Sequence, residues 1–156
     1  MRPGDGDAMQ RLHQRAIMAT SDAYYSLAER ESWAVGLRPD QYVTPANGHF
    51  DVVEADGVVV AFCDHGPDEI KGLYIDPDFQ GRGIGSALLE QAENRMREAG
   101  ITIAHIHSAL SSQGFYERHG YCEIERTKHR SRGGLMLPSV RLEKHLLPPL
   151  HPNIVK

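Results

Sequence analysis

Three glycines at alternate positions, Gly81, Gly83 and Gly85, stand where a strand-like segment gives way to a helix-like one. The stretch is IDPDFQGRGIGSALLEQAEN, residues 75–94. A glycine in a helix costs about 0.5–1 kcal/mol relative to alanine, because it loses more backbone freedom on folding. A chain that keeps three of them here needs space or conformations that only glycine allows. The pattern therefore predicts that something approaches this backbone closely.

A strand, a glycine-rich turn and a helix N-terminus together can bind an anion. The unpaired N–H groups of the first helical turn point outward, and the helix dipole adds positive potential. A phosphate could lie on these amides, and Arg82 would add a charged contact. The glycines would equally let the helix pack against the strand. A dinucleotide-binding fingerprint requires glycine or alanine where Ser86 stands, and a P-loop requires a lysine that this stretch lacks.

Apolar periodicity and turn residues divide the rest of the chain into alternating elements. The order is two helices, three strands, a helix, a strand, a helix and two strands, which indicates an α/β domain with a mixed sheet. One predicted helix begins at residue 7, and three more cover residues 22–33, 86–99 and 111–119. Two predicted strands form a hairpin over residues 49–65, and the others cover residues 69–75, 101–109, 121–130 and 135–146. Residues 38–48 are predicted as a loop.

Length and composition exclude several classes of protein. The 156 residues predict one domain over residues 1–148 and a proline-containing tail over 149–156. A net charge of −4 argues against a nucleic-acid partner, and the longest apolar run is too short to span a membrane. Cys63 and Cys122 have no metal-type spacing, and the first residues lack a signal-peptide pattern, so we expect reduced thiols in a cytoplasmic protein.

The glycine stretch also resembles a known family. Residues 80–85, QGRGIG, resemble the Q/R-x-x-G-x-G/A signature of the GNAT acetyltransferase superfamily. Residues 73–89 look like the strand and helix around that signature, and residues 115–121, FYERHGY, look like a later helix-to-strand block of the family. The resemblance implies an acyl-CoA N-acyltransferase fold, with a mixed, mostly antiparallel sheet flanked by about four helices. It also implies acetyl-CoA as the acetyl donor.

The resemblance further implies which residues bind this donor. In the family the signature wraps the pyrophosphate, and the strand before it pairs with the pantetheine arm and polarises the thioester carbonyl. Many relatives carry an asparagine that contacts the pantetheine; this chain departs from that pattern with SALSSQG, residues 108–114, where Ser111 or Ser112 would substitute only partly. The implied binding residues are Leu73, Tyr74, Ile75, Gln80, Gly81, Arg82, Gly83, Ile84, Gly85, Ser86 and Ser112, with no metal.

Acetyl transfer to an amine requires a group that removes a proton. An alkyl ammonium has a pKa of about 10.4, so forming the free amine at pH 7 costs roughly 4–5 kcal/mol. By resemblance Glu69 is the candidate base and Tyr116 the candidate acid for the leaving thiolate. Glu69 could instead be a surface carboxylate beside Lys71, and Tyr116 could be a buried tyrosine packed on the sheet.

Other polar and aromatic residues allow several interpretations. His105 and His107 alternate on one predicted strand and so face the same side, as a metal pair, a proton relay or hydrogen-bonded residues of a half-buried face. By resemblance Trp33, Tyr24 and Tyr25 lie where the family builds its acceptor pocket, but they could equally belong to the core.

The sequence therefore predicts an acetyl-CoA-dependent N-acetyltransferase that transfers the acetyl group directly to a primary amine of a small molecule or peptide. The alternative is a non-catalytic acetyl-CoA-binding regulatory module. The sequence leaves open whether the chain forms a homodimer, and we expect no membrane partner. Residues 1–3 look like the end of the family's first strand, so that strand would be short or begin upstream of this sequence.

Overall fold

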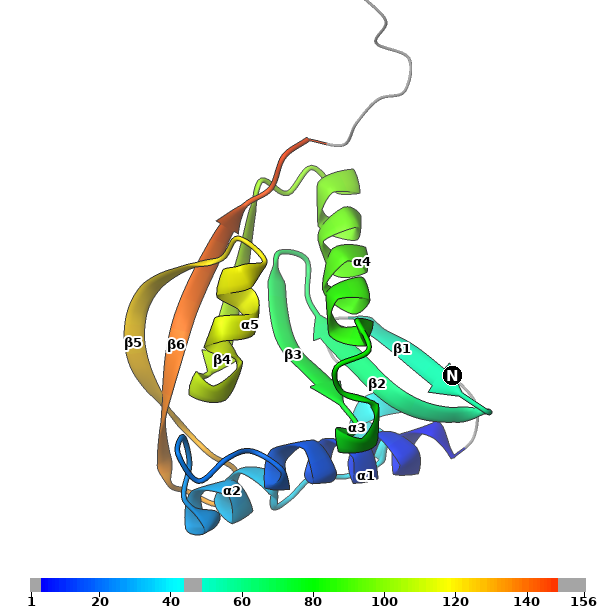
Figure 1. The fold of residues 1–156 in the computed structure, drawn as a ribbon, viewed down its shortest axis with the longest axis vertical. Helices are drawn as coiled ribbons and strands as arrows, with labels where there is room; N and C mark the ends of the chain where they lie inside the picture. The colour runs from blue at the N-terminus through cyan, green and yellow to red at the C-terminus, as the bar shows by residue number, and fades with distance from the viewer. Residues whose placement is uncertain (1–3, 44–48, 149–156) are drawn as a thin grey trace, which may run out of the picture.

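The computed structural model describes residues 4–43 and 49–148. These residues form one six-stranded sheet with the order β1-β2-β3-β4-β6-β5, flanked by helices (Figure 1). The strands are β1 (His49–Ala55), β2 (Val58–His65), β3 (Glu69–Ile75), β4 (Ile103–Ala109), β5 (Cys122–Arg130) and β6 (Met136–His145). The helices are α1 (Asp5–Met18), α2 (Leu27–Ala34), α3 (Asp40–Val43), α4 (Ile84–Glu98) and α5 (Gln113–Arg118), with short 3-10 turns at Pro77–Phe79 and Leu110–Ser112.

The sheet is mixed and mostly antiparallel, as predicted. Only β3 and β4 are parallel, and they pair at two positions, Glu69 with His105 and Ile70 with Ile106. Beyond Ile70 the two strands diverge (Figure 1), although β3 stays paired with β2 as far as Ile75. The divergence leaves one edge of β3 unpaired over its second half, and this opening positions the site described below.

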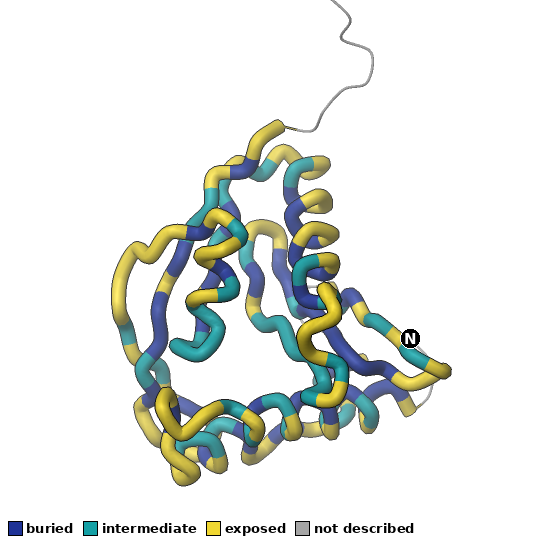
Figure 2. Tube along the Cα trace, viewed as in Figure 1, coloured by how far each residue is buried: buried dark blue, intermediate teal, exposed yellow. Residues whose placement is uncertain are grey.

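The larger core lies between the sheet and helices α4 and α5. Leu88, Ala92 and Met96 lie on one face of α4, and each is at most 2% exposed. Figure 2 shows buried residues along the side of α4 that faces the sheet and exposed residues along its outer side. Burying each large side chain of this kind contributes about 1.5–3 kcal/mol. The packing therefore fixes the start of α4 against the end of β3.

Helix α1 packs on strands β2 and β3 through an aromatic cluster. His13 lies against the Tyr74 ring, with ring centroids 3.9 Å apart, and its Nδ1 is 2.9 Å from the Tyr42 hydroxyl. Burial, and then the charge of Arg132, lowers the pKa of His13 to about 3. This imidazole is therefore neutral at pH 7 and behaves as part of the core.

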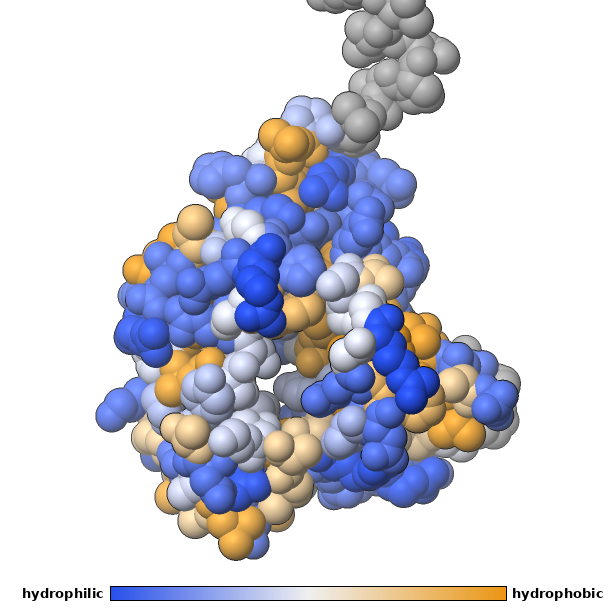
Figure 3. Space-filling model, viewed as in Figure 1, coloured by the Kyte–Doolittle hydropathy of each residue, from blue (hydrophilic) through white to orange (hydrophobic). Residues whose placement is uncertain are grey.

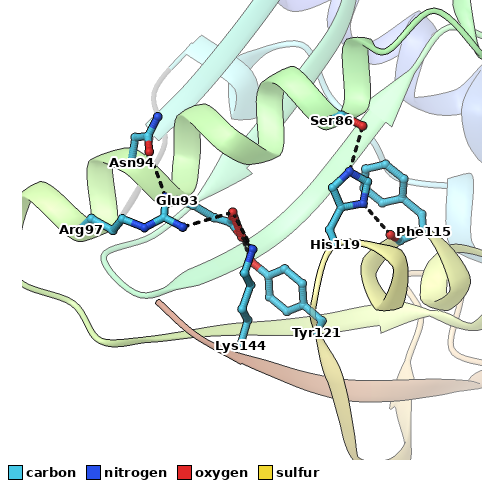
Figure 4. Close-up of polar contacts among 8 residues, drawn as sticks. All are labelled: Ser86, Glu93, Asn94, Arg97, Phe115, His119, Tyr121 and Lys144. Carbon is cyan, nitrogen blue, oxygen red and sulfur yellow. Dashed lines mark hydrogen bonds and ion pairs between the residues drawn. The ribbon is translucent and has the colours of Figure 1, made fainter. Parts of the chain in front are cut away.

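A buried carboxylate joins α4 to the C-terminal half of the sheet (Figure 4). Glu93 is 5% exposed and accepts hydrogen bonds from Lys144 Nζ at 3.0 Å and from the Tyr121 hydroxyl at 2.9 Å. Burial raises the pKa of Tyr121, and the Glu93 charge raises it further. Removing one partner of such a buried group typically costs about 3–5 kcal/mol. The network thus holds together the two halves that the divergence separates.

Several predicted boundaries differ from those in the structure. The second helix begins at Leu27 rather than at residue 22, because Ser26 accepts from the Glu29 N–H while the Glu29 carboxylate accepts from the Ser26 N–H. Residues 38–48 include the short helix α3, and α4 begins at Ile84 rather than at residue 86. The predictions for residues 1–3 and 149–156 lie outside the described residues. Within the described ranges, no helix has the length and apolar character needed to cross a bilayer.

Candidate active site

The three glycines serve two different purposes. Gly81 and Gly83 have φ of 76° and 79°, the left-handed region that disfavours other residues, and an added Cβ would meet no atom within 4 Å. The outer face of this turn is therefore open. At Gly85 an added Cβ would lie 3.1 Å from Ile75 Cδ1 and 3.3 Å from the Phe115 ring. The first two glycines expose the backbone, and the third allows α4 to pack closely.

A groove of about 650 Å³ runs along this open face, and we call it the glycine groove. Its walls come from α1, the end of β3, the start of α4, and α5. Ten of the predicted donor-binding residues line it: Leu73, Tyr74, Ile75, Gln80, Gly81, Gly83, Ile84, Gly85, Ser86 and Ser112. The N-terminus of α4 thus points its first-turn N–H groups toward a concave surface that could accept an anion.

The sequence prediction and the groove differ in several residues. Arg82 is not among the lining residues; its guanidinium lies 4.9 Å from the centre of the Phe79 ring and donates to the Asp78 carbonyl. Arg118 of α5 lines the groove instead. The other lining residues outside the predicted donor-binding set are Ala16 and Ile17 of α1, Ala19 and Thr20 just after it, and Trp33, Ser111, Phe115 and Tyr116. Tyr116 was predicted as the acid and Trp33 as an acceptor-pocket residue, whereas no local pattern marks the residues at the end of α1, because tertiary packing brings them to the turn.

A side-chain bridge joins the two helices that flank the groove (Figure 4). His119 Nδ1 lies 2.8 Å from the Phe115 carbonyl oxygen, so it must donate, because a carbonyl only accepts. Its Nε2 lies 2.9 Å from Ser86 Oγ and accepts from that hydroxyl whenever Nδ1 alone carries the ring proton. The bridge fixes the first turn of α4 against the end of α5.

A second cavity, of about 400 Å³, lies between β3 and β4 where they diverge, and we call it the gap cavity. Figure 3 shows the surface hollowed at the centre of this face. The gap cavity and the glycine groove share five wall residues: Trp33, Leu73, Tyr74, Ser112 and Tyr116. The two spaces therefore meet, and a molecule in one could reach a molecule in the other.

Tyr116 lies on the shared wall. The residue is 4% exposed, and its hydroxyl makes no hydrogen bond to any of the other described residues. Burial raises the pKa of the Tyr116 phenol, and the nearby Cys63 thiol raises it further. The phenol is therefore protonated at neutral pH and can donate a proton or hydrogen bond at the junction. The same burial shows that Tyr116 also packs in the core.

Glu69 lines the gap cavity at the level where β3 still pairs with β4. It is half-buried, and its charge contributes to the raised pKa of Asp64, after burial as the main cause. Glu69 precedes Leu73 by four residues, or about 13 Å along a strand. A proton from the junction would therefore need an intermediate to reach this carboxylate.

The paired histidines of β4 have different surroundings. His105 Nδ1 lies 3.4 Å from Glu143 and its Nε2 3.9 Å from Asp68, and it does not line the gap cavity. His107 does line it, with Nε2 2.7 Å from Ser139 Oγ. His129 faces His107 with ring centroids 5.7 Å apart. Burial, followed by the charges of His107 and Arg132, lowers the pKa of His129.

Two of the three N-terminal aromatic residues line the gap cavity. Tyr25 is 1% exposed; its hydroxyl donates to the Pro138 carbonyl at 2.6 Å and accepts from the Leu110 N–H at 2.9 Å. The Trp33 ring packs edge-on against Tyr25, with centroids 5.6 Å apart. Tyr24 is 48% exposed and lines neither space. Tyr25 is thus both a core residue and a wall residue.

Comparisons with known proteins agree with this architecture. A family model described as an acetyltransferase (GNAT) domain matches residues 46–123, half of the chain. An uncharacterized N-acetyltransferase of Methanocaldococcus jannaschii is 38% identical over 138 residues, covering 80% of this chain. The chain spans 59% of that relative's length.

Solved structures share the fold. A GCN5-related N-acetyltransferase from Rhodopseudomonas palustris superposes with a TM-score of 0.84 at 23% identity, covering 94% of this chain and 92% of that one. The PaiA N-acetyltransferase of Thermoplasma acidophilum, solved in complex with coenzyme A, has a TM-score of 0.69 at 19% identity, covering 93% and 95%. The resemblance predicted from residues 80–85 is confirmed: this chain belongs to the GNAT acetyltransferase family, a family of acyltransferases.

Proposed function

We propose that this chain is an acetyl-CoA-dependent N-acetyltransferase that acetylates a primary amine of a small molecule or peptide by direct transfer. One observation carries the proposal: the glycine groove and the gap cavity meet at Tyr116 and at the unpaired edge of β3. A donor held in the groove and an acceptor held in the cavity would therefore meet at these shared residues.

The residues of the groove fit a coenzyme A thioester. The open faces at Gly81 and Gly83 leave the α4 N–H groups accessible to a diphosphate, and Arg118 adds positive charge. The unpaired edge of β3 from Leu73 to Ile75 offers main-chain groups to the pantetheine amides, with Ser112 opposite. Acetyl-CoA would supply the activated acetyl group. A β3 N–H group, at Tyr74 or Ile75, would polarise its carbonyl.

Two side chains are proposed to move the protons. Tyr116, whose phenol is protonated at neutral pH, would donate a hydrogen bond to the leaving thiolate and then its proton. Glu69 would receive the proton of the acceptor ammonium. Glu69 and the junction are about 13 Å apart along β3, so this proton would travel through water or through His107, which also lines the gap cavity. The amine nitrogen bonds to the carbonyl carbon as the carbon–sulfur bond breaks, and the second proton that the nitrogen loses would restore the Tyr116 phenol.

The cysteines support direct transfer. Burial, and then the charges of Asp51 and Asp64, raises the pKa of Cys63 to about 12, so it is a poor nucleophile. Cys122 is exposed and lines neither space. Neither thiol is suited to carry the acetyl group. Both are free, which supports a reducing, cytoplasmic setting.

A thermal shift assay combined with a thiol-release assay tests the proposal. Acetyl-CoA should raise the melting temperature in a concentration-dependent way, whereas NAD should not, because only a ligand of the folded state stabilises it. Thiol release should then require an added amine. Stabilisation by acetyl-CoA without turnover of any amine would identify a regulatory module instead, and no stabilisation would refute acetyl-CoA binding.

A further inference from the structure

The gap cavity is basic although the chain is acidic overall. The chain has a net charge of −4, yet the cavity walls include Lys71, Arg130 and Arg132 with Glu69 as their one carboxylate. The lowered pKa of His129 keeps its ring neutral near pH 7. The cations therefore exceed the anions in a space that, by its volume, suits a small ligand.

The two arginines lack the carboxylate partners that several other arginines have. Arg15 pairs with Asp76 at 2.5 Å and Arg95 with Asp51 at 2.9 Å. Neither Arg130 nor Arg132 forms an ion pair with a carboxylate in the part of the chain that the structure describes. A guanidinium binds carboxylates strongly and in a fixed geometry, with two parallel hydrogen bonds. Two such groups on one cavity wall suit an anionic ligand.

Arg132 is held in place before any ligand binds. Its Nη1 donates to the Trp33 carbonyl at 2.7 Å, which ties the loop between β5 and β6 to the end of α2. Its charge also contributes to the lowered pKa values of His13 and His129, so the positive potential reaches the protein interior. A donor that is already fixed loses less conformational entropy on binding than a free side chain.

The strand register places these cations close to the junction. The Tyr25 hydroxyl donates to the Pro138 carbonyl and accepts from the Leu110 N–H, two residues before the shared wall residue Ser112, so Pro138 lies near the level of the shared wall. Arg130 pairs with Met136, two residues further along, or about 7 Å. An arginine side chain spans that distance, so an anion bound there would lie only a few bonds from an amine at the junction.

We infer that the acceptor is a small primary amine that also carries a carboxylate, as an α-amino acid does, and that Arg130 and Arg132 bind this carboxylate in the gap cavity. The inference rests on the proposed function. A requirement for this carboxylate distinguishes small amino acids from protein lysines, polyamines and peptide N-termini, whose reactive amines have no carboxylate nearby.

Matched acceptors test the inference. Each of the twenty proteinogenic amino acids is offered beside its α-carboxamide, and thiol release from acetyl-CoA gives kcat/KM for both. The wild-type chain should prefer at least one acid over its amide by about 10-fold or more, the usual strength of a charge-assisted hydrogen bond. Arg130→Gln and Arg132→Gln should each reduce that preference about 10-fold. Arg126→Gln, on the same strand but paired with Glu123, should leave it unchanged.

The thermal shift with acetyl-CoA, measured on every variant, separates the possible failures. If acetyl-CoA stabilises the protein but acids and amides react equally, or no acid reacts, the inference is wrong while donor binding stands. If acetyl-CoA does not stabilise the wild-type chain, the proposed function fails and the inference with it. A preference for acids that survives both arginine substitutions would also overturn the assignment.

Discussion

The glycine groove and the gap cavity adjoin each other but are built differently. The groove includes one short turn at which Gly81 and Gly83 leave main-chain N–H groups accessible. The cavity is lined by residues of β3, β4, β5, β6, α2 and the segments next to them, and one of its fixing hydrogen bonds joins residues 113 positions apart. A backbone site suits a ligand that is always the same. A side-chain site can change its ligand with a few substitutions.

Tyr116→Phe should have the largest effect, because Tyr116 belongs to both spaces. General acid catalysis typically contributes 10²–10⁴-fold, so we expect kcat to fall about 100-fold with little change in acetyl-CoA affinity. Steady-state kinetics and calorimetric titration measure the two quantities separately. Tyr24→Phe is the matched control, since that ring is 48% exposed and lines neither space. Unchanged turnover would show that Tyr116 serves only the packing.

Gly83→Ala tests whether the groove depends on backbone exposure. Gly57, in the hairpin turn, has the same φ of 79°, and an added Cβ at either glycine meets no atom within 4 Å. Both substitutions should therefore destabilise the fold similarly, by about 1–2 kcal/mol for a left-handed alanine. Only Gly83→Ala places a methyl group on the open face, and it should weaken acetyl-CoA binding about 10-fold by titration. Equal affinities for the two variants would exclude the turn as the anion site.

The same contrast explains what could be predicted from the sequence. The turn, the helix after it and the hairpin at Asp56–Gly57 follow from local patterns, and the structure confirms them. The start of α2 was also marked locally, since Ser26 and Glu29 form a capping box that the predicted start at residue 22 overlooked.

The gap cavity was not predictable in this way. His129, Ser139 and Arg132 become wall residues only because β5 and β6 pair beside β4. His105 and His107 share one side of β4, as the alternation predicts, but the divergence of β3 brings only His107 into the cavity. Register and strand divergence are tertiary properties, and no local spacing encodes them. The roles of Glu69 and Tyr116 stay predictions until turnover is measured.

His13→Gln should have a smaller effect, seen in stability against pH. His13 has a pKa of about 3 in the folded protein and about 6.5 when unfolded, so between these values the unfolded chain binds more protons. Stability contributed by this group is present above pH 6.5 and falls by up to about 1.4 kcal/mol per pH unit toward pH 3. Glutamine removes this dependence, so the difference between wild type and variant in denaturant titrations should shrink on acidification.

The control for this prediction is His145→Gln, because His145 is exposed at the end of β6. Its stability should follow the wild-type pH dependence closely. His13 lies on Tyr74, whose main chain forms the groove edge, so the experiment also tests whether α1 supports that edge. If the stability of His13→Gln depended on pH in the same way as that of the wild type, the buried imidazole would not be the cause of the loss of stability at acidic pH.

Thiol labelling should produce the smallest change, because both spaces are proposed to work without a cysteine. Cys122 is exposed, whereas Cys63 is fully buried with a pKa raised to about 12, so a disulfide-exchange reagent should modify one thiol in the folded protein and two after unfolding. Thiol release by the labelled enzyme should stay within about twofold of the untreated rate, the size of a surface perturbation. Cys122→Ser gives the matched reference. If activity fell in step with labelling in the wild type but not in Cys122→Ser, a thiol would take part in transfer. The glycine groove and the gap cavity would then not be sufficient for the reaction.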